Sequence, residues 1–347
     1  MSNSNRLFTI QFLSESWLLG WSVNNEDFQS RVSFSIMRQF CILGLFMAVL
    51  SVFKGLVSFA LIVLNTLVCF VPVMLLALLK CILPLASVRA LLNRMLDNIA
   101  TFWIGANNIN QRYLGRSVID VSGANDFALN DWYMVTANHQ SWVDILVLQR
   151  LFNRRIPFIK FFLKKELIWV PFIGLAWWAL EFPFMKRYSA ELLKKKPELK
   201  GKDIEVTKRA CDKFQYFPVS IMNFLEGTRF TTEKHDQQSS QYKHLLMPKA
   251  GGLSFALNAM DGKLHQLIDV TIVYPNGIPS FFDYLCGKVS LIRVHVRVMP
   301  IESALLGDYQ NDGAYRTYFQ RWVNDLWQQK DQQFEYLLQA EAEHLDQ

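Results

Sequence analysis

The chain has 347 residues, enough for one large domain or two, and 51% of them are apolar. Its formal net charge of +6 suits nucleic acid, anionic lipid or an acidic carrier protein as a partner. Nucleic acid is disfavoured, because the N-terminal region is very apolar and neither zinc-finger nor RNA-recognition motifs occur. The five cysteines lack CxxC spacing, so we predict neither a disulfide framework nor a metal site.

The N-terminal region is predicted to anchor the chain in a membrane. Residues 1–38 are mixed and polar, without the pattern of a secretory signal. From Gln39 to Leu79 the only charged residue is Lys54, and the run Gly55–Leu79 is long enough to cross a hydrocarbon core of ~30 Å. Either one tilted span or a two-helix hairpin dipping into one leaflet fits this pattern. Basic residues downstream of the run slightly favour a cytoplasmic C-terminal portion.

The rest of the chain reads as an α/β domain. An amphipathic helical pattern over 86–115 suits a membrane surface or packing on the next domain, and a loop is expected at 122–125. From Asp131, strand-length apolar runs alternate with helical patterns, which predicts a mixed, largely buried sheet flanked by helices. The expected strands are 132–137, 156–161, 182–185, 219–224, 269–274 and 289–299. The expected helices are 142–152, a short one after 174, 201–214, 251–260 and 314–343.

A histidine and a carboxylate stand at the first strand-to-helix junction. Asp144 lies five positions after His139, and on a regular helix this spacing would leave the two side chains roughly 140° apart. They can meet only if His139 lies in the turn before the helix and Asp144 in its first turn. Asp144 would then hold one ring nitrogen and leave the other as a general base. The stretch Ser141–Asp144 also fits a capping box, so a purely structural role stays open.

A second strand end carries the polar stretch Glu226-Gly-Thr-Arg229. Sites in α/β sheets gather beyond the carboxyl ends of strands. Gly227 allows a sharp turn or a close approach to a ligand, and the planar fork of Arg229 suits a phosphate. An ordinary turn would have the same composition.

Four blocks carry a resemblance to a known family. Asn138-His-Gln-Ser-Trp-Val-Asp144 resembles the His-x4-Asp motif of the glycerolipid acyltransferases, the family of 1-acylglycerol-3-phosphate acyltransferases. Phe224-Leu-Glu-Gly-Thr-Arg229 is similar to that family's Phe-Pro-Glu-Gly-Thr-Arg block, with leucine in place of proline. Between them, Lys165-x-Leu167-x3-Pro171-x2-Gly174 with Arg187 resembles the middle block, and Val270–Pro275 resembles the last. The blocks stand in the family's order, behind an apolar stretch like the family's anchoring helices.

The resemblance implies transfer of an acyl group from a thioester to the free hydroxyl of a lysophospholipid, most simply 1-acylglycerol-3-phosphate. His139 would be the base, and Asp144 would fix its tautomer. No G-x-S-x-G elbow occurs, so direct transfer is expected rather than a serine acyl-enzyme. The acceptor's glycerol phosphate would be held by Glu226, Gly227, Thr228, Arg229, Arg187, Lys165 and, as a further candidate, Lys249. Supporting positions would be Asn138, Pro171 and Gly174.

The implied partners are membrane phospholipids and lysophospholipids, with acyl-CoA or acyl carrier protein as the donor and neither cofactor nor metal. The implied location is a bacterial cytoplasmic membrane, with the catalytic domain facing the cytoplasm. Acylation of another lysophospholipid or of glycerol-3-phosphate, or a catalytically idle lipid-binding protein, remain alternatives. The expected segments are an extension (1–38), a membrane anchor (39–85), an amphipathic connector (86–130), the catalytic domain (131–300) and a helical tail (301–347).

Overall fold

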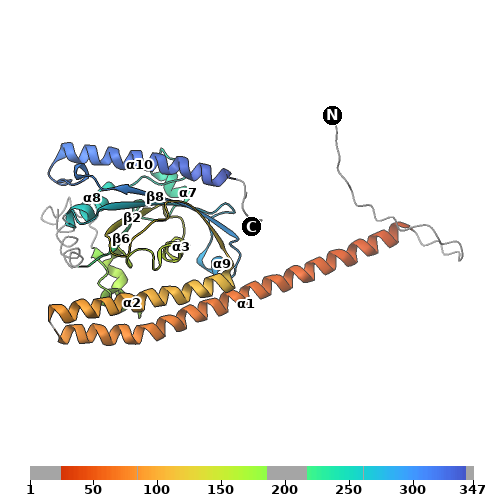
Figure 1. Cartoon of the computed structure of the whole chain (residues 1–347). Coiled ribbons are helices and arrows are strands. Elements are labelled where there is room, and N and C mark those ends of the chain that lie inside the picture. The colour runs from red at the N-terminus through yellow and green to blue at the C-terminus, as the bar shows by residue number, and fades with distance from the viewer. Residues whose placement is uncertain (1–24, 84, 186–216, 261, 341–347) are drawn as a thin grey trace. The chain divides into compact units, whose positions relative to one another are not determined.

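A computed structural model describes residues 25–83, 85–185, 217–260 and 262–340 (Figure 1). The chain divides into two units, residues 1–50 and 51–347. In the first unit the described residues belong to helix α1, Asn25–Ile82, which continues into the second unit. The remaining elements all belong to the second unit, and the candidate site is built there.

The second unit contains a six-stranded sheet in the order β1-β8-β7-β2-β6-β3. Neighbouring strands are parallel except β7 and β8, which are antiparallel, so the predicted mixed α/β fold is confirmed. The strands are β1 Val118–Gly123, β2 Tyr133–Ala137, β3 Ile159–Phe161, β6 Ser220–Phe224, β7 Gln266–Val273 and β8 Leu291–Pro300. A second, two-stranded sheet pairs β4 Leu163–Lys164 with β5 Phe184–Met185.

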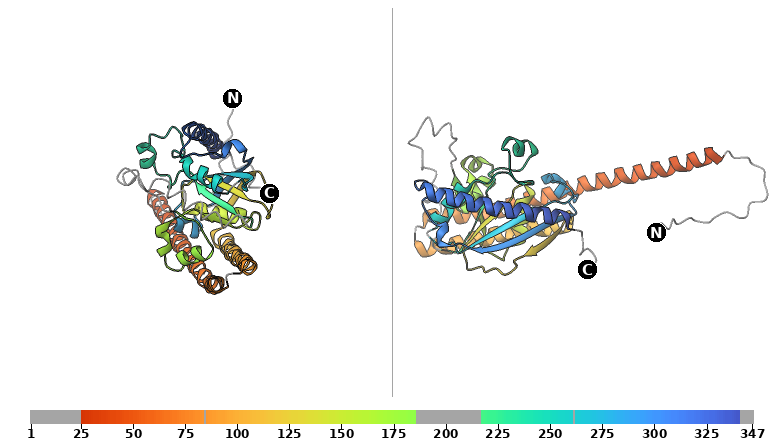
Figure 2. Two further views of the ribbon diagram at one scale, coloured as in Figure 1. Left: turned by 90° about the vertical axis from the view of Figure 1, so that its left-hand side faces the viewer. Right: turned by 90° about the horizontal axis from the view of Figure 1, so that it is seen from above.

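Helices cover both faces of the large sheet, which explains why its central strands β2 and β7 are buried almost throughout. On β2, Tyr133, Val135 and Ala137 pack into the core beneath α3, Val143–Phe152. The intervening Met134 points into the opposite core, under α8 (Ala250–Ala259) and α10 (Gly313–Gln339). Figures 1 and 2 show α10 and α3 on opposite sides of the sheet. A strand buried on both faces loses polar/apolar alternation, as in other parallel sheets.

The C-terminal half of α1 pairs with α2, Ala86–Asn110, beneath the α3 side of the sheet (Figure 1). Asn65 joins the two helices by donating through Nδ2 to Asn107 Oδ1 at 2.8 Å and to the carbonyl of Trp103 at 2.9 Å. Side-chain amides of this kind link helices strongly where the surroundings are apolar. A third core cluster joins this pair to α4, Ile173–Ala179.

The parallel strands β2, β6 and β7 end at one edge of the sheet. Their register pairs Ala137 with both Phe224 and Val270, so the residues that follow each strand emerge close together. This edge therefore brings together the two polar strand ends identified in the sequence, 85 or more residues apart.

The structure also differs from the expected elements. Helix α1 is continuous through Lys54 and Pro72, so residues 39–82 are one helix rather than two joined by a turn. Strand β1 occupies residues assigned to the connector and to a loop, and β3 is shorter than the predicted strand. The π-helical turn Gln111–Gly115, the short helices α7 (Thr232–Gln237) and α9 (Phe281–Leu285), and the 3₁₀ turns Lys165–Trp169 and Ser303–Leu305 were not predicted as separate elements. The helix expected at 201–214 lies outside the described residues.

Candidate active site

His139 and Asp144 meet at the C-terminal end of β2. His139 lies in the turn before α3 and Asp144 in the first turn of that helix, the arrangement that their spacing demanded. The ring nitrogen Nδ1 of His139 lies 2.8 Å from Asp144 Oδ2. Just before it, the buried Asn138 donates through Nδ2 to the carbonyl of Ile272 and accepts from its amide through Oδ1, both at 2.8 Å. These two bonds tie the end of β2 to β7, and so fix the point from which the histidine turns away.

The Asp144 carboxylate is fully buried and accepts hydrogen bonds on both oxygens. Oδ2 receives the backbone amides of Gln140 (2.6 Å) and Ser141 (2.9 Å) besides the imidazole. Oδ1 receives the hydroxyl of Tyr274 at 2.5 Å. Burial, reinforced by the negative charge of Asp144, raises the pKa of Tyr274, which keeps this hydroxyl a donor. Every partner thus donates to the carboxylate, which fixes its orientation.

The capping box is present in a modified form. Asp144 accepts from the amide of Ser141, while the hydroxyl of Ser141 accepts from the amide of Val143 at 3.2 Å and donates to the carbonyl of Pro279 at 2.7 Å. The Asp144 carboxylate thus caps the N-terminus of α3 and also orients the imidazole of His139. The capping role and the orienting role are therefore compatible.

The imidazole of His139 is held with one nitrogen accessible. The ring stacks on Phe224, with centroids 3.9 Å apart and planes at 14°. With Nδ1–H donated to Asp144, the lone pair resides on Nε2, for which the described residues provide no hydrogen-bond partner. His139 lines a cavity, so Nε2 is placed to accept a proton from a bound hydroxyl.

Glu226 lies behind the histidine rather than in the cavity. Its side chain is buried, and Oε1 accepts from the backbone amide of His139 at 3.2 Å. Oε2 is buried without a hydrogen-bond partner among the described residues. Removal from water, reinforced by the charge of Asp144, raises the pKa of Glu226 to about 8, so the carboxyl is mostly protonated at neutral pH.

The turn that follows Glu226 presents a cation to the cavity. Gly227 has φ of +70°, a left-handed conformation that favours glycine. The guanidinium of the exposed Arg229 lies over the ring of Trp142, 4.9 Å from its centroid. Lys234 Nζ donates to Thr228 Oγ1 at 2.9 Å and to the carbonyl of Arg229 at 2.8 Å, which ties the turn to α7. Gly227, Thr228 and Arg229 line the cavity with His139.

The cavity has a volume of about 570 Å³ and a predominantly apolar wall. It reaches from the imidazole, between α3 and the segment around α4, to the α1–α2 pair. Typical lining side chains are Phe70, Trp103, Leu146, Phe161 and Trp177. Small-molecule sites commonly have this size and composition, with a few polar groups at one end.

The other predicted site residues lie elsewhere. Lys165, at the start of a 3₁₀ turn, and Lys249, which precedes α8, are exposed and do not line the cavity. Gly174 is buried where a β-carbon would come within 2.2 Å of the carbonyl oxygen of Ile168, so it permits close packing of the segment that Pro171 begins. Arg187 lies outside the described residues.

Three residues contact the site although the sequence interpretation gave them no role. Tyr274 follows β7 at the same sheet edge as His139, so the strand-end argument could have singled it out. Trp142 lies inside the recognised motif, but its stacking under Arg229 depends on a turn almost 90 residues away. Nothing in the sequence marked Lys234.

Glu226 predicts a specific dependence of stability on pH. Between its ordinary pKa of 4.5 and about 8, the folded protein holds a proton that the unfolded chain has released. The free energy of unfolding therefore falls as pH rises through this window, with a slope of roughly 1.4 kcal/mol per pH unit. Glu226→Gln removes the titration, so the variant should gain stability relative to the wild type from pH 5 to pH 8. Unfolding curves at a series of pH values measure this, and exposed Glu302→Gln should leave the slope unchanged.

The region of the chain that contains this site is similar to known proteins. Residues 118–275 match the sequence model of a family described as Acyltransferase. Over this stretch, which is less than half of the chain, the protein is similar to that family. This stretch spans from β1 to the residue after Tyr274, and so includes both halves of the site.

Curated relatives agree with the family. Human 1-acyl-sn-glycerol-3-phosphate acyltransferase gamma is 29% identical over 209 residues, covering 57% of this chain and 51% of its own length. The human delta enzyme is 27% identical over 211 residues with the same coverage. The chain thus spans about half the length of the curated relatives it matches. The solved 1-acyl-sn-glycerophosphate (LPA) acyltransferase PlsC of Thermotoga maritima aligns over 79% of this chain and 97% of its own, with 15% identity and a TM-score of 0.39.

Proposed function

We propose that this chain moves an acyl group from a thioester to the free hydroxyl of a lysophospholipid, with 1-acylglycerol-3-phosphate as the acceptor. The observation that carries the proposal is the arrangement of His139. Its Nδ1 is held by Asp144, and its Nε2 has no hydrogen-bond partner among the described residues, at the junction of an apolar cavity and the turn that bears Arg229. A base, an acyl site and an anion site meet at one point. The curated relatives are named for the same kind of activity.

The chemistry follows from the hydrogen bonds. As the acceptor oxygen attacks the thioester carbonyl, Nε2 of His139 takes the hydroxyl proton, and the buried carboxylate of Asp144 stabilises the imidazolium. The tetrahedral intermediate collapses by breaking the carbon–sulfur bond. The thiolate leaves with the proton returned from His139, so the base is regenerated. Hydrogen bonds from Tyr274 and two backbone amides hold the Asp144 carboxylate in place throughout.

The cavity is suited to hold the acyl chain. Its wall between α3, α4 and the α1–α2 pair is made of aliphatic and aromatic side chains, and it begins beside the imidazole. A hydrocarbon chain placed there removes apolar surface from water and leaves its carbonyl next to His139. Acyl-CoA or acyl carrier protein would supply such a thioester.

Arg229 is the proposed phosphate ligand of the acceptor. It is the cation among the residues that line the cavity, and Trp142 beneath it orients its planar face. Thr228 adds a hydroxyl. Lys165, Lys249 and Arg187 stay further candidates, while Glu226 is proposed to support His139 rather than to touch the acceptor.

Arg229→Ala should therefore impair recognition of the acceptor selectively. Losing a charge-assisted phosphate contact is expected to raise KM for lysophosphatidate about 10- to 100-fold, with KM for the acyl donor changed less than threefold. Steady-state rates with each substrate varied in turn measure both. Arg316→Ala, an exposed arginine on α10, is the matched control and should change neither. Equal loss for donor and acceptor would contradict the assignment.

The activity itself is tested with purified full-length protein and a panel of donors and acceptors. Acyl-CoA and acyl carrier protein thioesters are each offered with lysophosphatidate, other lysophospholipids and glycerol-3-phosphate. Formation of phosphatidate as the preferred product is the expected result. A different preferred acceptor would correct the substrate, and lipid binding without turnover of any thioester would reject the enzyme.

The proposed place of action is a membrane surface. Helix α1 contains one candidate span, Ile42–Ile82, judged by length and composition alone, and only 17% of its most apolar window is buried. At about 1.5 Å per residue these 41 residues exceed the thickness of a hydrocarbon core, so α1 would tilt strongly or lie partly at the surface. The bacterial cytoplasmic membrane, with the domain on the cytoplasmic side, is the location predicted from the sequence.

A further inference from the structure

The segment Leu167–Leu180 contains no charged or polar side chain. It comprises the end of a 3₁₀ turn and helix α4. A short helix that is apolar all round is normally buried on every side. This one is not, because large apolar side chains on its outward side remain exposed.

The two faces of the segment have different surroundings. The inner face, with Ile173, Ala176, Trp177 and Leu180, lines the cavity that begins at His139. The outer patch, as we name it, consists of Trp169, Phe172, Leu175 and Trp178, which are 85%, 50%, 47% and 47% exposed. Leu175 and Trp178 lie one turn apart on α4, and none of the four lines the cavity. A single layer of chain therefore separates the cavity from whatever covers the outer patch.

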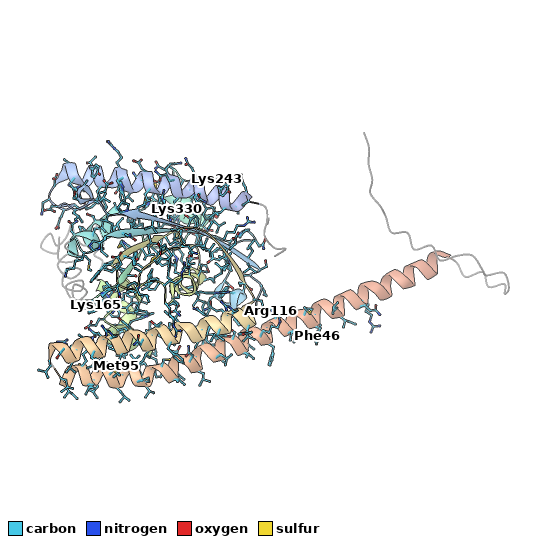
Figure 3. All side chains as sticks on the ribbon, viewed as in Figure 1. Phe46, Met95, Arg116, Lys165, Lys243 and Lys330 are labelled. Atoms are coloured by element: carbon cyan, nitrogen blue, oxygen red, sulfur yellow. The ribbon has the colours of Figure 1, made fainter. Side chains whose placement is uncertain are left out.

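The outer patch continues the apolar surface of α1. The ring of Phe172 packs edge-on against Phe70 of α1, with centroids 5.3 Å apart. Beside Phe70 on α1, Leu67 and Val71 are exposed as well. Figure 2 shows the segment on the α1–α2 side of the sheet, away from α10, and Figure 3 places Lys165, at its start, on that same side.

We propose that the outer patch is a second membrane-contacting element, embedded in the bilayer next to α1. The occupant is lipid rather than a protein partner, because the patch is continuous with a helix face apolar enough to cross a membrane. Tryptophans concentrate at the membrane–water boundary, and the exposed Lys165 at the edge suits anionic headgroups.

Membrane contact at the outer patch would also determine how the substrate reaches the site, an inference that rests on the proposed function. With the outer patch in lipid, α4 forms a wall shared by the bilayer and the cavity. A lysophospholipid could then reach His139 by moving sideways past α1 and α4, without its chain crossing water.

Trp169→Glu tests the proposal, because it puts a charge into the patch while leaving the cavity wall intact. With lysophosphatidate presented in vesicles of phosphatidylcholine and phosphatidylglycerol, its KM should rise about tenfold or more. With a short-chain, water-soluble lysophosphatidate, kcat and KM should stay within twofold. Tyr336→Glu, 67% exposed on α10 across the sheet, is the matched control and should change neither. An unchanged KM on vesicles would overturn the proposal.

A binding measurement separates this proposal from the enzymatic one. Tryptophan fluorescence of full-length protein in vesicles with acyl-chain-brominated lipid reports contact with the bilayer and needs no turnover. Trp169→Phe should reduce the quenched fraction, whereas Trp322→Phe on α10 should not. Quenching that is independent of Trp169, or a self-association that Trp169→Glu abolishes, would show that another part of the chain or a second copy covers the patch. Absence of acyl transfer with normal quenching would reject the function and keep the membrane contact.

Discussion

His139→Ala is expected to lower kcat for acyl transfer by about 10²–10⁴-fold, with little change in KM for either substrate. Alanine removes the atom that accepts the hydroxyl proton, while the apolar cavity and the Arg229 turn remain in place. Asp144→Asn should cause a loss of similar order for another reason. The Asp144 carboxylate now accepts four hydrogen bonds, and the NH₂ group of an asparagine would face one or more of these donors instead. The substitution would also disfavour the His139 tautomer that carries its proton on Nδ1 and leaves Nε2 free to act as the base.

Product formation under saturating substrates measures these losses. His265→Ala is the matched control, since that imidazole also meets an aspartate, Asp131, at 3.2 Å but is largely exposed and remote from the cavity. It should retain the wild-type rate. If His139→Ala and Asp144→Asn both turned over normally, His139 would not be the base.

Lys330→Met is expected to destabilise the fold by about 3 kcal/mol, because it removes one of the two cations that pair with the buried Asp269 and leaves only Arg297 of that pair. Lys330, on α10, is fully buried, and its Nζ lies 2.7 Å from Asp269 Oδ1 and donates to the carbonyl of Val270 at 2.6 Å. Figure 3 shows it beneath α10, towards the sheet. Burial lowers the pKa of Lys330, which measures how far it has been removed from water. Thr136 and Arg297 complete the cluster around Asp269.

A surface ion pair between α10 and the loop before α8 provides the control. Lys243 and Glu335 form an ion pair at 2.8 Å, but the lysine is 69% exposed, so Lys243→Met should cost less than about 1 kcal/mol. Thermal or denaturant unfolding in detergent compares the two. The double variant Lys330→Met/Asp269→Asn should regain part of the loss, because it no longer buries a carboxylate that has lost one of its two cations. Equal effects of Lys330→Met and Lys243→Met would show that the cluster contributes nothing special.

The sequence predicts the catalytic geometry well where the constraint is local. The four residues between His139 and Asp144 leave a single way for the two side chains to meet, and the contact is present at 2.8 Å. The ends of β2 and β6 were also predicted to converge, because carboxyl ends of parallel strands share an edge. The mixed α/β class followed from the alternation of apolar runs and helical patterns.

Other features depend on contacts that no local pattern encodes. The burial of Glu226 behind His139 follows from the packing of α8 and α10 over the sheet, so its composition alone suggested a ligand. Strand β1 is largely exposed, with Ile119 packed against the core, and its place in the sheet comes from pairing with β8 far along the chain, which no local pattern encodes. Lys330 appeared as one more cation in a polar tail, since nothing near it in sequence reveals that α10 covers Asp269.

The Lys330 cluster can form only late in synthesis of the chain. Val270 precedes Lys330 by 60 residues, so β7 is synthesised long before its counter-charge. Until α10 emerges, the nascent sheet holds Asp269 beside Arg297 without the cation that lets this face close. Helix α10 is therefore needed before this face of the sheet can close, because its side chains complete both the Asp269 ion pair and the apolar cluster over the strands.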